Sequence, residues 1–425
     1  MFRKNKKTII TGIIFFLIIL FMGTYYLLRN DVTVNNIVTS ILGGNLSNNV
    51  STTQEIKVGN DNKYYQEINE IFSLGRGWLL HNVQDDGSFV YLYDIRNKEG
   101  DKNNIIRQLL TFRVIARLCQ QGSQEFCAIH KNNLDFVFRH GLYKTEIKDG
   151  QKIGYILYDS KAKLGSSALL LRLLISSPYS NEYSQQLQEL VAGIKFLQNS
   201  DGSFKSPFFV VSPNFEYNKE RKLNFYSGEA ILALMEYYRK TNNQQILDMA
   251  KKSEDYYLVK YVDNMQKNYY PAYVPWHTMA LSKLWHATND LKYTEAIFKL
   301  NDELLKMQDS WDYVGRFYSP EHPEYGKPHS ASDAIYSESL VTAYRIALEL
   351  DDKTRQRNYM FAIKQSLGNI ASLQLCNKSN PFNDIPRKLC GSLQVRKNSQ
   401  FIRVDSLAHT MDFIMALRQL LDIKN

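Results

Sequence analysis

Six stretches of small and apolar residues recur along the chain, each beginning at or beside a polar residue or a glycine. They begin near residues 107, 165, 228, 277, 338 and 408. Segments such as SSALLLRLLI and EAILALMEYY are apolar nearly all round, and a helix of that kind has to be covered on every side. The pattern therefore predicts six buried helices, spaced by roughly 50 to 70 residues, which leaves room for one more helix and a long loop in each repeat.

A more amphipathic stretch precedes each of these buried helices. We expect partner helices at residues 64–82, 129–140, 182–198, 244–260, 291–307 and 353–375. Segments such as YTEAIFKLNDELLKMQ carry charge on one side, which suits a helix with one face in water. Strict alternation of the two kinds predicts an all-α (α/α)6 toroid of six helical hairpins over residues 61–425. Its inner helices would run parallel, so that their N-terminal ends meet at one mouth.

Residues 1–60 follow a different pattern. Basic residues in the segment MFRKNKK precede an uncharged apolar run at residues 8–28, and about 20 apolar residues are enough for a helix to cross a bilayer. We expect residues 1–28 to be a cytoplasmic stub and a transmembrane signal anchor in the inner (cytoplasmic) membrane, with the C-terminal domain on the extracytoplasmic, periplasmic side. A cleaved signal peptide is the alternative. Residues 29–60, rich in Asn, Ser and Thr, are predicted to form a flexible linker.

The cysteines form two near-neighbour pairs, Cys119 with Cys127 and Cys376 with Cys390. In an extracytoplasmic domain two short-loop disulfides follow, each stabilising the fold by roughly 2 to 3 kcal/mol. Four unpaired buried thiols in a reducing compartment are the alternative. Neither pair has a CxxC spacing or a His at metal-ligand spacing, so we expect no metal site, and no motif points to another cofactor.

The formal net charge is +9, with Lys and Arg spread through the whole chain. No basic helix with interleaved aromatic residues stands out, so the sequence does not predict nucleic-acid binding. A negatively charged substrate or a membrane surface stays open as a partner.

Two segments repeat almost literally after partner helices: QDDGSF from Gln84 and QNSDGSF from Gln198. Their Asp-Gly pairs favour turns, after which Phe89 and Phe204 can fold back onto the apolar core. We interpret both turns as structural. A catalytic role for Asp86 or Asp201 stays open, because loop carboxylates can line the cleft of a toroid.

These turns, together with the alternating helices, resemble the α/α-toroid proteins: six-hairpin glycosidases, uronyl-hydrolase-like enzymes, the C-terminal domain of glucuronyl C5-epimerases and, more distantly, terpenoid cyclases. The resemblance covers about residues 60–425 and is architectural. The acidic DxDD motif of the cyclases and the zinc-binding Cys/His set of lanthionine cyclases are absent from the sequence. The resemblance implies the fold, whereas the chemistry has to be argued from residues.

Two candidate sites mark the third and fourth buried helices. Glu229, after Tyr226 and Gly228, is expected either to be a general acid tuned by burial or to complement the helix dipole. Trp276 and His277 would offer a stacking surface beside a titratable base, although a lone His often satisfies a core hydrogen bond instead.

The last two buried helices carry further ionisable residues. Asp333, Tyr336 and Glu338 form the densest ionisable cluster, and helical spacing places Asp333 and Tyr336 on one face. Helix capping by Ser332 and Asp333 is the alternative. Asp405 and His409 are four residues apart, a spacing that lets the carboxylate orient the imidazole. N-capping by Asp405 and a buried His409 explain the spacing equally well.

Three cations lie near the predicted mouth: Arg107, Lys163 and Arg403. With the N-terminal ends of the inner helices they would create a positive potential that suits carboxylate, phosphate or sulfate. Cations turned to solvent are the alternative.

We therefore expect a membrane-anchored carbohydrate-active enzyme that acts on an acidic polysaccharide or glycan. Inverting hydrolysis would use Glu229 with Asp333 or Glu338, whereas an epimerase or lyase would abstract a proton with His277 or a Tyr. The alternative from another class is a non-catalytic toroid that binds envelope glycans or proteins. Its mouth would carry Tyr and Trp without converging ionisable groups.

Overall fold

The computed structural model describes residues 61–96, 98–100, 103–206, 219–308, 314–381 and 385–422. The predicted membrane anchor at residues 8–28 and the linker at 29–60 lie outside these described residues. Among the described helices, none is both long and apolar enough to span a bilayer. Asn60–Asn425 form one compact unit.

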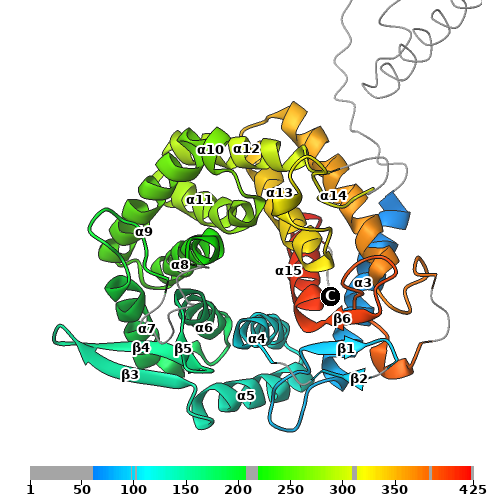
Figure 1. Ribbon diagram of the computed structural model, residues 1–425, viewed down its shortest axis with the longest axis horizontal. Helices are drawn as coiled ribbons and strands as arrows, with labels where there is room; N and C mark the ends of the chain where they lie inside the picture. Colours follow the sequence, from blue (N-terminus) through cyan, green and yellow to red (C-terminus); the bar gives the residue numbers. More distant parts are fainter. Residues whose placement is uncertain are drawn as a thin grey trace, which may run out of the picture. The chain divides into compact units, whose positions relative to one another are not determined.

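Six of the described helices form an inner ring (Figure 1). The ring closes because each inner helix packs against the next and the last packs against the first. In chain order they are α4 (Ile105–Gln120), α6 (Leu164–Ser176), α8 (Lys219–Thr241), α11 (Val274–Thr288), α13 (Ser330–Glu349) and α15 (Val404–Leu420). The predicted toroid of buried helices is therefore confirmed.

An outer ring of six described helices surrounds the first (Figure 1). They are α3 (Asp61–His81), α5 (Gln124–Arg139), α7 (Ser184–Phe196), α9 (Gln244–Tyr257), α12 (Leu291–Leu305) and α14 (Lys353–Leu373). Each inner helix packs extensively on the outer helix that follows it, and α15 packs on α3. The first and last described long helices thus complete the final hairpin.

The connections from outer to inner helices are long and carry short elements that an all-α prediction does not contain. One antiparallel sheet has the order β2-β1-β6 and the other β3-β4-β5. The strands are β1 (Leu92–Asp94), β2 (Lys98–Glu99), β3 (Tyr143–Lys148), β4 (Gln151–Tyr158), β5 (Lys161–Ala162) and β6 (Phe401–Arg403). The short helices of these connections are η3 (Leu258–Asp263), α10 (Met265–Asn268), η4 (Pro271–Tyr273), η5 (Pro323–Tyr325) and η6 (Arg387–Leu389). A further one, η1 (Ser180–Tyr183), lies in the inner-to-outer connection between α6 and α7.

Two inner helices begin earlier than the sequence pattern predicts. Helix α8 starts at Lys219 and α13 at Ser330, whereas the patterns place the starts near 228 and 338. The segment KERKLN is rich in helix-favouring residues although it is polar, so helix propensity extends α8 beyond its buried stretch. At α13, the His329 side chain accepts a hydrogen bond from the Ala331 backbone N–H and caps the helix.

The repeated Asp-Gly turns are structural. Asp86 Oδ1 accepts a hydrogen bond from the Ser88 backbone N–H at 2.8 Å, and Asp201 Oδ1 accepts one from the Ser203 N–H at 2.9 Å. The phenylalanine that ends each turn is buried in the core. Both carboxylates are therefore used inside their own turns.

The same closure recurs where the sequence hides it. Residue pairs Gln308–Phe317 and Gln374–Leu393 form the same kind of isolated antiparallel bridge as Gln198–Phe204. Each turn contains a glycine with positive φ, and a Cβ there would come within 2.0–2.3 Å of a backbone carbonyl oxygen on a neighbouring outer helix. These glycines are Gly87, Gly202, Gly315 and Gly391. The turns thus hold adjacent outer helices in contact.

Replacing one of these glycines tests that interpretation. Gly202→Ala should destabilise the fold by about 2 to 5 kcal/mol, because its Cβ would lie 2.3 Å from the Lys252 carbonyl oxygen and its φ is +95°. Gly122, with φ +97° and no atom within 4 Å of its Cβ position, is the matched control and should cost only about 1 to 2 kcal/mol. Urea unfolding measures both values, and equal losses would contradict the close-approach argument.

Both predicted disulfides are present. Cys119–Cys127 joins the end of α4 to α5, and Cys376–Cys390 closes a loop in the connection after α14. The pairing by sequence proximity is therefore confirmed.

Candidate functional site

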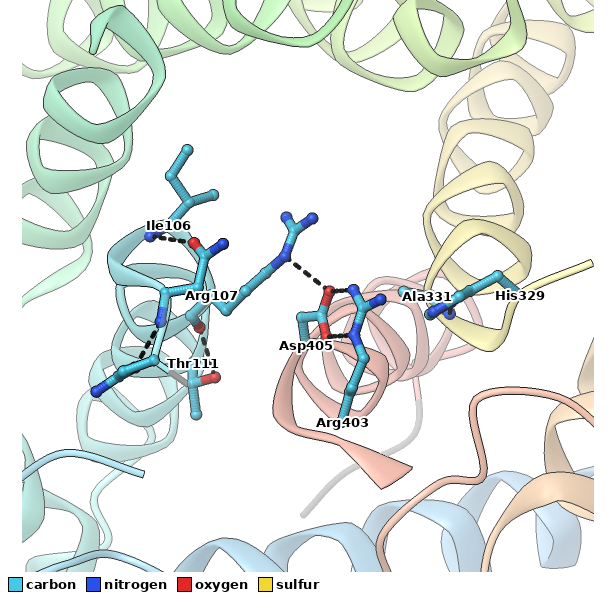
Figure 2. A network of polar contacts seen from close by, with 9 residues as sticks. Ile106, Arg107, Thr111, His329, Ala331, Arg403 and Asp405 are labelled. Carbon is cyan, nitrogen blue, oxygen red and sulfur yellow. Dashed lines mark hydrogen bonds and ion pairs between the residues drawn. The ribbon is translucent and has the colours of Figure 1, made fainter. Parts of the chain in front are cut away.

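The N-terminal ends of the inner helices bring three predicted residues together. Arg107 on α4 reaches Asp405 on α15, and Arg403 approaches the same carboxylate from β6 (Figure 2). Arg107 Nε lies 2.9 Å from Asp405 Oδ2, and Arg403 Nε donates to Asp405 Oδ1 at 2.9 Å. We call Arg107, Arg403 and Asp405 the mouth cluster, and the region around these N-terminal helix ends the mouth.

Strand pairing explains how Arg403 arrives there. β6 pairs with β1, with Arg403 opposite Leu92, so the first and last outer-to-inner connections fix the residue just before α15. Asp405 then lies in the first turn of α15.

Asp405 is a fixed negative charge. Its side chain is 1% exposed; burial alone would raise its pKa, but Arg107 and Arg403 hold the pKa of Asp405 well below its ordinary value. A carboxylate with such a low pKa cannot act as a general acid near neutral pH. Asp405 therefore orients Arg107, which is one-third exposed.

Two imidazoles lie beside this cluster. Burial lowers the pKa of His409 to about 4, and its Nδ1 has no hydrogen-bond partner. The predicted orientation of His409 by Asp405 is not seen as a hydrogen bond, because the carboxylate is engaged by Arg107 and Arg403. His409 is therefore a neutral imidazole at pH 7.

The second imidazole, His329, has a defined tautomer. Its Nδ1 accepts a hydrogen bond from the Ala331 backbone N–H at 3.0 Å, so Nε2 is assigned the proton of the neutral ring. Burial, and next Arg403, lower the pKa of His329 to about 4, and Nε2 is buried without a partner. His329 thus has a spare N–H donor beside the mouth cluster (Figure 2).

Glu229 is the buried acid of the mouth. Burial raises its pKa to about 7 despite the nearby Arg107 and Arg172, and its Oε2 has no hydrogen-bond partner. A Cβ on Gly165 would lie 2.7 Å from that oxygen and 2.3 Å from the Tyr226 ring. The first turn of α6 therefore needs glycine to admit Glu229 and Tyr226.

Trp276 connects these groups. Its ring centroid lies 6.1 Å from that of His409, and the Arg172 guanidinium is 5.6 Å from the Trp276 ring. Gly228 is required here too, because a Cβ would approach Trp276 Cβ to 2.6 Å. An aromatic side chain, an acid, two neutral imidazoles and a held guanidinium thus belong to one region.

Comparison with solved structures identifies the architecture. The α-1,6-mannanase GH76A from Salegentibacter sp. superimposes with a TM-score of 0.58 at 11% identity, over 84% of this chain and 99% of that chain. D-mannose isomerase gives 0.59 at 12% identity, over 84% and 97%. Cellobiose 2-epimerase from Bacillus thermoamylovorans gives 0.58 at 14% identity, over 83% and 99%.

The chain has the α/α-toroid fold of six-hairpin, glycosidase-like enzymes. Residues 172–325 also match the family described as β-L-arabinofuranosidase, GH127 catalytic domain. No curated protein sequence matches the chain. At these identities the likeness establishes the fold and leaves the reaction to the residues of the mouth.

Several predicted residues of this toroid lie elsewhere. His277 Nδ1 is 2.8 Å from Glu254 on the outer helix α9, and its Nε2 is 3.2 Å from Ser227 Oγ. His277 is 2% exposed, lies among tyrosine rings and has a hydrogen-bond partner on each ring nitrogen. Neighbouring residues of a helix face different directions, so His277 contacts Glu254 and Ser227 whereas the Trp276 ring lies near His409. A catalytic role for His277 stays a prediction.

Asp333 and Tyr336 also face the outer layer. Asp333 accepts hydrogen bonds from the Phe317 backbone N–H and from Asn369 on α14, both at 3.1 Å. The Tyr336 ring packs edge-on against Phe317. Asp333 thus fixes the turn before α13, as Gln108 does where it pairs with the backbone of Phe89.

Lys163 is the residue before α6, partly buried, and it contributes to the electrostatics of Asp159. Asp159 lies in the β4–β5 turn, and the mouth cluster is built from Arg107, Arg403 and Asp405.

Glu338 belongs to a second, deeper layer that the sequence analysis does not predict. Arg113 Nη1 lies 3.0 Å from Asp412 Oδ2, Arg117 also pairs with Asp412, and Arg172 Nε donates to Glu236 at 3.0 Å. Burial and the charge of Asp412 raise the pKa of Glu338. We call these six residues the ionic layer.

The ionic layer follows the helix period. Glu236 and Asp412 lie seven residues after Glu229 and Asp405, which is roughly 10 Å further along the same helix face. Burial would raise the pKa of Glu236, yet Arg172 and Arg113 hold it at about 2. The ionic layer could have been predicted from single charged residues within apolar segments such as SSALLLRLLI, because a buried charge needs a partner of opposite charge.

Proposed function

We propose that this protein is a carbohydrate-active enzyme that transfers a proton at an acidic sugar residue, as an epimerase or a lyase does. The observation that carries the proposal is the arrangement at the mouth: Glu229 with a pKa near 7, His329 and His409 neutral, and Arg107 held by Asp405. These groups converge, which favours an enzyme over a non-catalytic toroid.

The mouth has too few unpaired carboxyl groups for hydrolysis, which favours proton transfer. Inverting hydrolysis needs two working carboxyl groups about 6.5 to 9.5 Å apart. Asp405 is bound by Arg107 and Arg403, Asp333 is turned to the outer layer, and Glu338 lies in the ionic layer beside Asp412. Glu229 is the mouth carboxyl that has an unpaired oxygen.

An acidic substrate suits Arg107. Its Nε faces Asp405, its terminal nitrogens point away from Asp405 (Figure 2), and its side chain is 33% exposed. A guanidinium offers a planar pair of N–H donors that matches a carboxylate. The N-terminal ends of the parallel inner helices add further positive potential.

The proposed step assigns one role to each residue. Arg107 binds the sugar carboxylate, and His409 accepts the proton from the carbon next to it. His329 Nε2–H donates a hydrogen bond to the oxygen on which negative charge develops. The protonated Glu229 then returns a proton to that carbon, which inverts it, or protonates a leaving oxygen, which completes an elimination.

We also propose that the enzyme works outside the cytoplasm. Residues 8–28 would anchor it in the inner membrane as a single span, with residues 29–60 as the tether. Two disulfides suit an oxidising compartment.

Glycoside hydrolysis is the second candidate, supported by the match of residues 172–325 to a β-L-arabinofuranosidase catalytic domain. Here Glu229 would be the general acid. One incubation separates the candidates: full-length protein with uronate-containing glycans in deuterated water. Proton transfer gives deuterium next to the carboxyl group or an unsaturated uronate, whereas hydrolysis gives new reducing ends without either.

His409→Gln should abolish the deuterium signal, because the base is removed. His286→Gln is the matched control, since His286 lies in the last turn of α11 and pairs with Glu349 at the surface. Equal deuterium incorporation by His409→Gln and the wild type would exclude the proposed base.

A further inference from the structure

Four aromatic rings gather on two of the long connections. Tyr269 and Tyr270 precede η4 and α11, whereas His322 and Tyr325 precede α13. Tyr325 stacks on His322 with centroids 4.8 Å apart and meets Tyr270 edge-on at 5.8 Å. Tyr269 meets the same ring at 5.7 Å. We call these four residues the aromatic rim.

The rim is on the side of the toroid where the mouth lies. Both connections run from the end of an outer helix to the start of an inner helix, and the mouth cluster is built at those starts. Tyr325 is four residues before His329, so the two Cα atoms are at most about 14 Å apart. Tyr270 is likewise six residues before Trp276.

The rim retains contact with solvent. His322 is exposed, and Tyr270 and Tyr325 are half-buried. Tyr269, whose hydroxyl oxygen is buried, supports the Tyr325 ring. The tyrosines hold one another in place, which lowers the entropy lost when a ligand binds. Aromatic rings with polar edges suit a sugar, whose C–H face stacks on the ring while its hydroxyls bond at the edge.

We propose that the aromatic rim binds sugar residues next to the one that reacts, so that the substrate is a chain and not a free monosaccharide. This inference rests on the proposed function, which supplies the reacting residue at Arg107. Because the Cα atoms of Tyr325 and His329 are at most about 14 Å apart, a glycan whose reacting sugar lies at the mouth cluster would have its neighbouring sugars at the rim. The rim then sets the preferred length and orientation of the glycan.

The test is calorimetric binding of oligogalacturonates and oligoguluronates of one to six residues to the full-length protein. Wild-type affinity should rise at least about tenfold from one residue to the longest oligomer of one series. Tyr325→Ala and His322→Ala should flatten this rise and leave monosaccharide affinity unchanged. Tyr325→Phe, which keeps the ring, should behave as the wild type.

Two outcomes overturn the proposal: a wild-type affinity that does not rise with length in either series, including no binding, or a rise that Tyr325→Ala and His322→Ala leave intact. Failure of the proposed reaction is a separate result, because it appears as absent deuterium incorporation while the length dependence of binding persists.

Discussion

Glu229→Gln is expected to lower kcat by about 10²- to 10⁴-fold. The amide keeps the shape of the side chain next to Gly165 but cannot give up a proton. Because burial raises the pKa of Glu229 to about 7, the protonated acid predominates below that pH. Wild-type activity should therefore fall as pH rises above about 7, and this alkaline limb should be missing from the residual activity of the variant.

Asp333→Asn provides the matched control for this variant. Burial raises the pKa of Asp333 to about 7 as well, but its oxygens bind the Phe317 backbone and Asn369. We expect Asp333→Asn to lose stability and to keep a kcat near the wild-type value. Turnover of a uronate glycan from pH 5 to 9, with circular dichroism to check folding, measures both. A Glu229→Gln enzyme with wild-type kcat would remove Glu229 from the reaction.

Asp412→Ala is expected to lower the free energy of unfolding by about 3 to 5 kcal/mol. Asp412 is buried and pairs with both Arg113 and Arg117, so its removal leaves two guanidinium groups without their shared carboxylate. Burial would raise the pKa of Asp412, but Arg113 and Arg117 lower it below the ordinary value. The contribution of Asp412 to stability is therefore present at neutral pH and is lost as pH falls through the folded-state pKa.

The surface pair Arg139–Asp135 is the control for the ionic layer. Its side chains are 79% and 46% exposed, and removing an exposed pair costs at most about 1 kcal/mol. Urea unfolding of Asp412→Ala and Asp135→Ala at pH 7 gives the comparison. If the two variants lost the same free energy, the ionic layer would not stabilise the toroid as argued.

The fold could be predicted from helix periodicity because the two kinds of helix bury different fractions of their surface. An inner helix such as α6 is buried on all sides and is apolar nearly all round, whereas α12 has one solvent-exposed face and carries its polar residues there. The disulfides followed from short spacing. The turns that begin at Gln308 and Gln374 cannot be recognised from the sequence. Each has extra residues between its glutamine and its glycine, Gly315 or Gly391, so the short spacing from Gln to Asp-Gly in the first two turns is lost.

The site could be predicted only in part. Arg107, Glu229, Asp405 and His409 were expected at the mouth from their place near helix starts, and the structure places them there. Each residue of a helix is rotated by about 100° from the one before it, so a start displaced by a few residues turns a candidate outward. That rotation separates His277 from Trp276 and Asp333 from the mouth. His329 lies just before α13 and could not be predicted, because its role as a donor depends on the hydrogen bond that its Nδ1 accepts from the Ala331 backbone N–H.

The central claim is that the mouth cluster binds and reacts with an acidic sugar. A crystal structure of the Glu229→Gln protein with a bound uronate oligosaccharide tests it most directly. The account predicts a sugar carboxylate on the terminal nitrogens of Arg107, with the adjacent carbon facing His409. An oligosaccharide bound away from Arg107, or with its carboxylates turned to solvent, would contradict it.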